Sequence, residues 1–448
     1  MTYQEFKQAV IREAEALGIT EYEIYYQAEE STSVSAFRHE LNQFTSSVEG
    51  GLCFRCIAEG RMGYAATEAL DEEQAKRIVR TAYDNALSLE TDDPVFLVAG
   101  GQEYAQIQKE TYDLPKTDEL IRKVLDTQEA MYAADPKVID GCSTQGMAIA
   151  MELAMYNSKG LDLSYRNNMA ALIVGAVVSD GAEMENDYQI KVGKLDTLDS
   201  ETLTSKAAKT ALAKLGGEVP PTGTCPVIFD PEAMSDLLST FSSIFSSETA
   251  QKGLSKLADK EGKVIASPVV TVVDDPFYKD NPMPLPFDAE GSPTYCKKLI
   301  EKGELKTLLY NLKTAAIAGK QTTGNASKGS YNSSIAVRPF TMYLQAGELT
   351  EEELLAQAEN GVYINSLGGL HAGADPITGD FSLQSAGYLI RDGKKGAHVK
   401  SFTVAGNFYD LLNKIVAVGN NLELPMATGS TAFGSPSVLV KDLSIAGK

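Results

Sequence analysis

The chain is long and acidic, and it has few histidines. Its 448 residues predict two or three domains, and a formal net charge of −21 argues against a basic surface that would bind nucleic acid. There is no Trp and there are only three His, which limits any mechanism that needs a histidine cluster.

Cysteine usage and the start of the chain both indicate a cytoplasmic protein. The five cysteines are odd in number and dispersed, which favours reduced thiols over a disulfide framework. The opening segment MTYQEFKQAVIREAEALG mixes charges of both signs and lacks the order of a signal peptide. The longest apolar run, residues 169–178, is too short to span a bilayer, so no membrane association is expected.

Residues 1–98 predict an N-terminal α+β domain. Apolar residues recur at helical spacing over residues 3–17 and again over residues 71–89. Between these helices, from residue 21 to residue 67, the apolar period changes to two, as in EIYYQAE and GLCFRCIAE. This pattern is typical of an antiparallel meander.

Residues 99–221 predict a central domain of similar architecture. A helix is expected from about residue 118, and another over residues 200–215, followed by the boundary signal Pro220-Pro221. A turn signal, NSKG, separates two alternating segments and indicates a hairpin. The expected strands cover residues 147–156, 161–167 and 169–178.

Residues 222–448 predict a larger, β-rich and glycine-rich C-terminal domain. It opens with the strand CPVIF, and Asp230-Pro231 then starts a helix with a capping carboxylate and a proline in its first turn. That helix has one apolar face and one serine face, which either lines a cavity or faces water. Two further helices are expected near residues 350–359 and 409–416. The fold class is therefore predicted to be α+β.

Familiar catalytic and metal-binding motifs are absent from the sequence. The pair His39-Glu40 lacks a second histidine at the spacing of HExxH and falls in a strand pattern. Cys53 and Cys56 form a CxxC, but residues three apart in a strand point to opposite faces, so their thiols are expected to diverge. No G-x-S-x-G or P-loop signature occurs.

Polar, glycine-spaced segments of the third domain are the remaining candidates for a site. They are PFDAEG, TTGNASKG, SLGGLHAGADPITGDFS and AGNFYDLL. One interpretation is that they are turns in which Asp and Asn cap the backbone. The other is that these loops on a sheet scaffold form a binding cleft. The residues alone leave both interpretations open.

With these segments the chain resembles the TldD/PmbA family, long described as modulators of DNA gyrase and understood as a two-subunit peptidase system. The resemblance is carried by VVTVVDDP, PFDAEG, TTGNA, DPITGDFSLQSAGYLIRDG, AGN and the terminal GSTAFGSPSVLV. It extends in one order over essentially the whole chain. It implies a TldD/PmbA-like C-terminal domain preceded by the two α+β domains.

The resemblance also distinguishes between the two branches of this family. The catalytic TldD branch carries HExxxH on a helix early in the C-terminal domain and a later cysteine ligand. Here the corresponding positions are Ser239, Thr240 and Ile244, and the stretch LPMATGSTAFGS has no cysteine. Hydroxyl groups and an isoleucine cannot replace imidazoles and a thiolate as ligands. The chain therefore resembles the PmbA (TldE) branch, with no catalytic or metal-binding residues of its own.

That branch implies a peptide-binding subunit that pairs with a TldD-like metallopeptidase. Zinc or iron is then expected in the partner and no cofactor in this chain, and the ligand is an unfolded or extended peptide. Strand addition would make such binding depend on the backbone more than on titratable groups. The candidates for the peptide cleft are Asp288, Glu290, Asn325, His371, Asp375, Asp380 and Asn407.

Two other functions stay open at this stage. The first is a homodimeric regulatory or binding protein that acts on a protein target without hydrolysis. The second is a peptidase with an unrecognised site, in which Asp288 and Glu290 act as acid and base.

Overall fold

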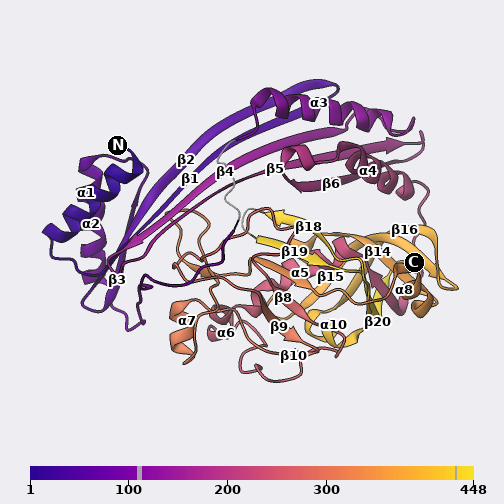
Figure 1. Cartoon of the computed structure of the whole chain (residues 1–448). Coiled ribbons are helices and arrows are strands. Elements are labelled where there is room, and N and C mark those ends of the chain that lie inside the picture. Colours follow the sequence, from indigo (N-terminus) through magenta and orange to yellow (C-terminus); the bar gives the residue numbers. More distant parts are fainter. Residues whose placement is uncertain (108–113, 429–430) are drawn as a thin grey trace.

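A single, strongly curved antiparallel sheet dominates the first half of the chain (Figure 1). The structure is a computed structural model that describes residues 1–107, 114–428 and 431–448, so the first two residues of GSTAFGSPSVLV lie outside it. The strand order is β3-β2-β1-β4-β5-β6. The strands are β1 (Tyr22–Phe37), β2 (Glu40–Ala58), β3 (Arg61–Thr67), β4 (Ser143–Asn157), β5 (Asp162–Ser179) and β6 (Met184–Gly193).

Strands from both predicted α+β domains thus share one sheet, in which β1 pairs with β4 along its length. The segments expected as separate strands over residues 161–167 and 169–178 form the one long strand β5. The strand is not interrupted at Asn167 and Asn168, because both asparagines keep the regular antiparallel pairing with β4. The domain boundaries near residues 98 and 221 stay predictions.

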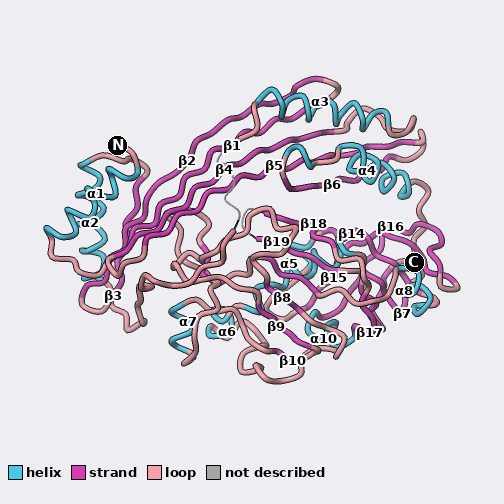
Figure 2. The backbone as a smooth tube through the Cα atoms, viewed as in Figure 1, coloured by secondary structure: helices cyan, strands magenta, loops and turns pink. Residues whose placement is uncertain are grey.

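Four helices cover one face of this sheet in two pairs, one pair at each end (Figures 1 and 2). Ile24 packs with the first pair, whereas Val34 and Ala36 pack with the second. These three residues are even-numbered in β1, so both pairs lie on the same face. The helices are α1 (Tyr3–Ala16), α2 (Glu72–Ser88), α3 (Thr117–Ala133) and α4 (Ser200–Lys214), and a short 3-10 turn, η1 (Leu195–Thr197), precedes α4.

Local side chains define where these helices begin. Thr2 and Glu5 form a capping box at α1, and the carboxylates of Asp71 and Asp199 accept backbone N–H groups at α2 and α4. Among the described residues, no helix is both long enough and apolar enough to cross a bilayer.

His39 lies in the turn between β1 and β2, where both Arg38 and His39 have positive φ. Its ring Nδ1 is 2.7 Å from the Glu129 carboxylate, and the side chain is about half exposed. Its ring also stacks on that of Tyr132, so His39 is a half-exposed residue of the turn, and it belongs to no group among the described residues that could hold a metal ion.

The opposite face of the sheet contacts the C-terminal domain. Tyr25 and Cys53 pack against Met283 and Phe287 there, whereas Cys56 faces the α1 and α2 side. The two thiols therefore diverge, as the strand period predicts. Both cysteines are free and buried.

The C-terminal domain contains two further six-stranded sheets and a small pair of strands, and it confirms the α+β class. One sheet has the order β16-β15-β14-β7-β20-β17 and the other has the order β10-β9-β8-β13-β19-β18. The first comprises β7 (Gly223–Phe229), β14 (Gly361–Gly368), β15 (Asp380–Arg391), β16 (Lys394–Asn407), β17 (Ile415–Val418) and β20 (Val438–Ala446). The second comprises β8 (Val272–Asp274), β9 (Lys297–Glu301), β10 (Glu304–Leu305), β13 (Thr341–Leu344), β18 (Glu423–Thr428) and β19 (Thr431–Ser435), and the pair is β11 (Ala326–Ser327) with β12 (Ala336–Val337).

One hydrophobic core joins these two sheets through the helix α5 (Pro231–Phe241). The apolar face of α5 contributes Met234, Leu237 and Phe241 to that core. The serine face does not behave uniformly: Ser235 is buried and donates to the carbonyl of Pro231, whereas Ser243 is exposed. The remaining helices are η2 (Ser242–Phe245), α6 (Ser247–Gln251), α7 (Leu312–Ile317), α8 (Glu351–Ala358), α9 (Leu370–Gly373) and α10 (Phe408–Lys414).

Gly63 allows α2 to pack directly on β3. A Cβ at this position would meet the carbonyl oxygen of Ala82 at 1.9 Å and the amide nitrogen of Ala86 at 2.5 Å, both backbone atoms that cannot move alone. We expect Gly63→Ala to lower the free energy of unfolding by about 1–3 kcal/mol in urea titrations. Gly223→Ala is the control, because a Cβ there meets open space, and equal losses in both variants would contradict this packing.

Candidate functional site

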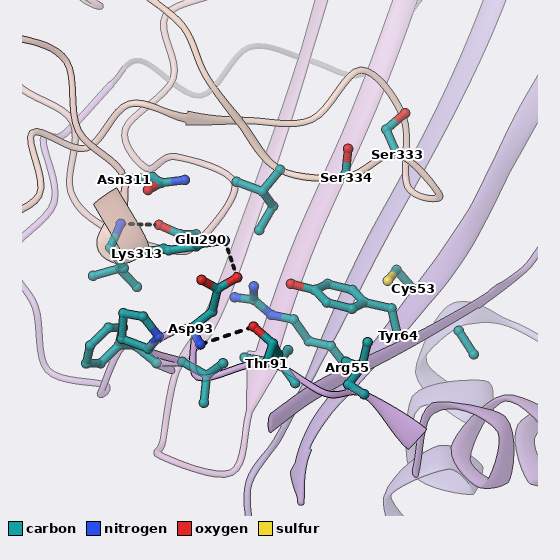
Figure 3. A pocket seen from close by; sticks show the side chains of 18 of the residues that line it. Cys53, Arg55, Tyr64, Thr91, Asp93, Glu290, Asn311, Lys313, Ser333 and Ser334 are labelled. Atoms are coloured by element: carbon teal, nitrogen blue, oxygen red, sulfur yellow. Dashed lines mark hydrogen bonds and ion pairs between the residues drawn. The ribbon is translucent and has the colours of Figure 1, made fainter. Parts of the chain in front are cut away.

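A cavity of about 660 Å³ lies between the N-terminal half of the sheet and the C-terminal domain (Figure 3). Its lining comes from β2 and β3, from the segment that follows α2, and from C-terminal loops around Glu290, the start of α7 and residues 332–335. We call it the sheet cavity. It joins parts of the chain that are far apart in sequence.

The turn PFDAEG brings Glu290 to this cavity. The Asp288 carboxylate accepts the backbone N–H groups of Glu290, Ser292 and Ala326, so it holds the turn together. Gly291 has φ +82° and lies so close to Leu161 that a Cβ would approach it to 2.5 Å. Both the backbone conformation and the packing therefore require glycine here.

Glu290 is a carboxyl group with an unusual environment. It is 6% exposed, and its Oε2 accepts the backbone N–H of Leu312 at 2.8 Å. Burial, together with repulsion from Asp288, raises the pKa of Glu290 to about 8, although the Arg55 guanidinium opposes this shift. Burial also raises the pKa of Asp288. Glu290 thus resembles the groups with raised pKa that occur at functional sites.

Arg55 faces Glu290 from β2, and sequence reasoning did not single it out. It is 5% exposed, and its Nη2 atom forms an ion pair with Glu23 of β1 at 2.6 Å. Its Nε atom has no hydrogen-bond partner in the part of the chain that the structure describes. The signal in the sequence is an arginine inside the apolar strand GLCFRCIAE, since charged residues are rarely buried without a partner.

A second cavity of about 530 Å³ lies between the central region and the C-terminal domain. We call it the α5 cavity, because Glu232 and Asp236 of α5 line it together with residues of β6 and α4. Burial raises the pKa of Asp236 to about 7, with repulsion from Glu232 adding to the effect. Lys206 is 3.8 Å from Glu232 and partly balances this charge.

The positions that the resemblance in the sequence matches to the metal ligands of the catalytic branch lie just beyond these residues. Ser239 and Thr240 are on the last turn of α5 and partly buried, and the Thr240 hydroxyl donates to the carbonyl of Asp236. Ile244 is fully buried in the core. Within residues 1–107, 114–428 and 431–448, no group of three or more His, Cys, Asp or Glu side chains could hold a metal ion. The donors present do not fit zinc or iron.

Asn325 belongs to a buried polar network next to the PFDAEG turn. It is fully buried, donates to Asp274 at 2.8 Å, and accepts from Lys297 at 3.0 Å. Asp274 and Lys297 themselves form an ion pair at 3.2 Å. Asn325 thus joins β8, β9 and the start of β11.

The other candidates lie at a different place, around the start of β15 and the end of β16 and in the segment that precedes β15. The Asn407 amide donates to Asp380 and to the carbonyl of Thr378, and the Asn407 side chain also caps α10. This hydrogen bond from Asn407 lowers the pKa of Asp380. Asp375 accepts backbone N–H groups in its own turn, and His371 is exposed in the short helix α9.

The contacts therefore divide the sequence candidates into two groups. Asp288, Glu290 and Asn325 lie around one turn, whereas Asp380 and Asn407 pair across β15 and β16 with Asp375 close by in the same loop. Of the sequence candidates, Glu290 alone lines either of the two cavities described here.

Comparison with known proteins assigns the class of this fold. Family models match three consecutive parts of the chain: PmbA/TldA metallopeptidase domain 1 over residues 22–86, the central domain over residues 111–215, and the C-terminal domain over residues 222–447. This is the three-domain architecture of PmbA/TldA metallopeptidases. The chain belongs to the PmbA/TldD family, so the resemblance in the sequence is confirmed.

Individual relatives agree with this assignment. Metalloprotease PmbA of Escherichia coli O157:H7 is 26% identical over 93% of this chain and 90% of its own length. A TldD homolog of Buchnera aphidicola subsp. Schizaphis graminum is 27% identical over 54% of this chain and 52% of its own length.

Solved structures match over nearly the whole chain. A crystal structure from Thermotoga maritima MSB8, named for modulation of a DNA gyrase, has a TM-score of 0.90 and 30% identity, covering 99% of this chain and 100% of that one. TldE from Thermococcus kodakarensis has a TM-score of 0.89 and 24% identity at the same coverage, and this likeness concerns the fold.

Proposed function

We propose that this chain is a non-catalytic, peptide-binding subunit of a TldD/TldE-type metallopeptidase. The observation that carries the proposal is the chemistry of the α5 region: Ser239, Thr240 and Ile244 stand where the resemblance in the sequence implies the HExxxH of the catalytic branch. Hydroxyl groups and a buried isoleucine do not bind a transition metal. Metal-dependent hydrolysis then requires a partner that supplies zinc or iron.

Peptide binding is supported by the architecture around the two cavities. Both cavities lie where the large sheet meets the C-terminal domain, and their volumes fall within the roughly 300–1,000 Å³ range of small-ligand sites. In addition, β3 pairs only with residues 52–58 of β2, so within the described chain the earlier part of β2 is paired on one side only. An extended peptide can add to such an edge through backbone hydrogen bonds.

The partner in this proposal is a TldD-like subunit in a heterodimer, and the complex acts in the cytoplasm on unfolded or extended peptides. The five free cysteines are consistent with a reducing compartment. Self-association into a homodimer is the alternative arrangement.

The acid-base alternative is less well supported by the geometry. Asp288 accepts three backbone N–H groups, which uses its lone pairs to hold the turn. It therefore has little capacity to move a proton to or from a substrate beside Glu290.

Metal analysis and peptide cleavage test the proposal. The chain is purified alone and together with a TldD-like subunit that bears HExxxH, and zinc and iron are measured alongside cleavage of an unfolded peptide. We expect no stoichiometric metal and no cleavage for the chain alone, and chelator-sensitive cleavage for the pair. Chelator-sensitive cleavage by the chain alone would refute the proposal.

Matched variants assign the chemistry to one subunit. Replacing the HExxxH glutamate of the partner by Gln should abolish cleavage, whereas Ser239→Ala with Thr240→Ala in this chain should leave it unchanged. If the pair is inactive but the chain captures a different protein as a homodimer, the regulatory alternative replaces the proposed function.

A further inference from the structure

The sheet cavity contains opposite charges whose hydrogen-bonding capacity is not filled. Glu290 and Arg55 both line it, and Figure 3 shows the Arg55 guanidinium directed towards the Glu290 carboxylate. Oε2 of Glu290 is bonded to the N–H of Leu312, and in the described chain Oε1 accepts no hydrogen bond. Nε and Nη2 of Arg55 also have no hydrogen-bond partner in the described chain, but both atoms are buried below the cavity surface. Oε1 of Glu290 is therefore the group that a ligand donor would satisfy, with the Arg55 guanidinium beside it.

The charge of this cluster selects the kind of ligand. Glu23 already neutralises Arg55 through their ion pair at 2.6 Å. Ionised Glu290 is then one negative charge in excess, which a cationic group in the cavity would balance. The positive guanidinium of Arg55 beside it favours an oxygen acceptor on the same ligand.

We propose that the sheet cavity binds the free N-terminal residue of a peptide, whose α-ammonium pairs with Glu290 and whose first carbonyl oxygen accepts from Arg55. An α-ammonium and the adjacent carbonyl are separated by one tetrahedral carbon, so one residue presents both groups side by side. Few other peptide elements do this. The inference rests on the proposed function for the choice of a peptide as the ligand.

The rest of the cavity suits an apolar first side chain. Its walls include Met62, Leu89, Phe96 and Ile335. Phe96 and Leu89 are 40% exposed, so they form a surface that a bound side chain would cover. The half-exposed ion pair between Lys313 and Asp93 also lines this cavity, so one part of its wall is polar.

Binding of an ammonium group is coupled to release of a proton. Since burial and repulsion from Asp288 raise the pKa of Glu290 to about 8, its carboxyl group is mostly protonated at pH 7 before an ammonium group binds. An incoming ammonium favours the ionised form, so the carboxyl proton leaves to solvent as the ion pair forms. In the described chain the charged groups that face Glu290 or line its cavity are Asp288, Arg55, Glu23, Lys313 and Asp93, and the other titratable side chains in its lining are Tyr64 and Cys53.

Calorimetry with the purified chain alone tests this inference, so that its result does not depend on cleavage with any partner. The probes are leucyl-glycyl-glycinamide, its N-acetylated form and leucinamide, each titrated at pH 7 in two buffers of different ionisation enthalpy. We expect the free peptide to bind at least about tenfold more tightly than the acetylated one. Proton release should accompany binding of the free peptide.

Variants assign the effect to Glu290. Glu290→Gln should weaken the free peptide about tenfold and abolish proton release, whereas Glu352→Gln on the exposed surface of α8 should change neither. Equal affinity for the free and the acetylated peptide, or binding of neither, would overturn the inference even if Glu290→Gln fails to fold. If leucinamide and the tripeptide bind with equal affinity, the inference that the ligand is a peptide is overturned. The site would then bind free amino acid derivatives.

Discussion

Replacing Asp274 by Ala is expected to lower the free energy of unfolding by about 3–5 kcal/mol, because it leaves the buried Lys297 ammonium without its counter-ion. Asp274 is fully buried and Lys297 is 7% exposed. The Asp274 carboxylate also accepts the N–H groups of Phe340 and Thr341 and the amide of Asn325. All of these donors lose their acceptor together in the variant.

Urea denaturation followed by circular dichroism measures this loss. Asp280→Ala is the matched control, since Asp280 is mostly exposed and lies 3.9 Å from an exposed Lys279, a pair worth at most about 1 kcal/mol. A loss below about 1 kcal/mol for Asp274→Ala would mean that the Lys297 ammonium finds another acceptor. The role assigned here to the network would then be wrong.

Arg55→Met is expected to cost a similar amount, about 3–5 kcal/mol, because Glu23 would be buried without its cation. Glu23 is 1% exposed and has the Asn157 amide at 3.4 Å as its other partner. Burial raises the pKa of Glu23 even with Arg55 present. Without Arg55 the carboxyl should take up a proton, so the loss should be smaller at pH 5 than at pH 8.

A double variant distinguishes this cause from lost packing. Glu23→Gln combined with Arg55→Met removes both charges and should recover about half of the loss or more. The control Arg12→Met breaks an exposed ion pair with Glu72 and should cost no more than about 1 kcal/mol. If the double variant is less stable than Arg55→Met alone, then the side-chain packing, and not the buried charge, explains the effect.

Much of the fold follows from local pattern. Helices over residues 3–17, 71–89 and 200–215 were predicted within a residue or two of α1, α2 and α4, because apolar spacing and capping side chains act over a few residues. The meander of residues 21–67 likewise appears as β1 to β3. What local pattern did not reveal is the pairing of β1 with β4, which brings together residues separated by more than a hundred positions.

The candidate site, too, was predicted only in part from the sequence. The sequence pointed to Glu290 through a turn motif, and the motif is built as its residues suggest, with Asp288 capping the backbone. Arg55 was missed because its importance depends on Glu23 in a neighbouring strand and on a loop more than two hundred residues away. His371 and Asp375 share a motif with other candidates, but both are exposed, His371 in the short helix α9 and Asp375 in the turn that follows it.

The sequence by itself determined that the chain is acidic, that its cysteines have the dispersed pattern of reduced thiols, in which order its helices and strands follow, and to which family it belongs. It also determined that residues 239, 240 and 244 supply no imidazole or thiolate ligand. These properties depend on residue types and on short spacings. Only the tertiary structure decided that one sheet spans the first half of the chain and that its far face closes a cavity against the C-terminal domain. The physical reason is burial. The pKa of Glu290 is raised, and Arg55 becomes a buried charge, only where packing removes water from both side chains.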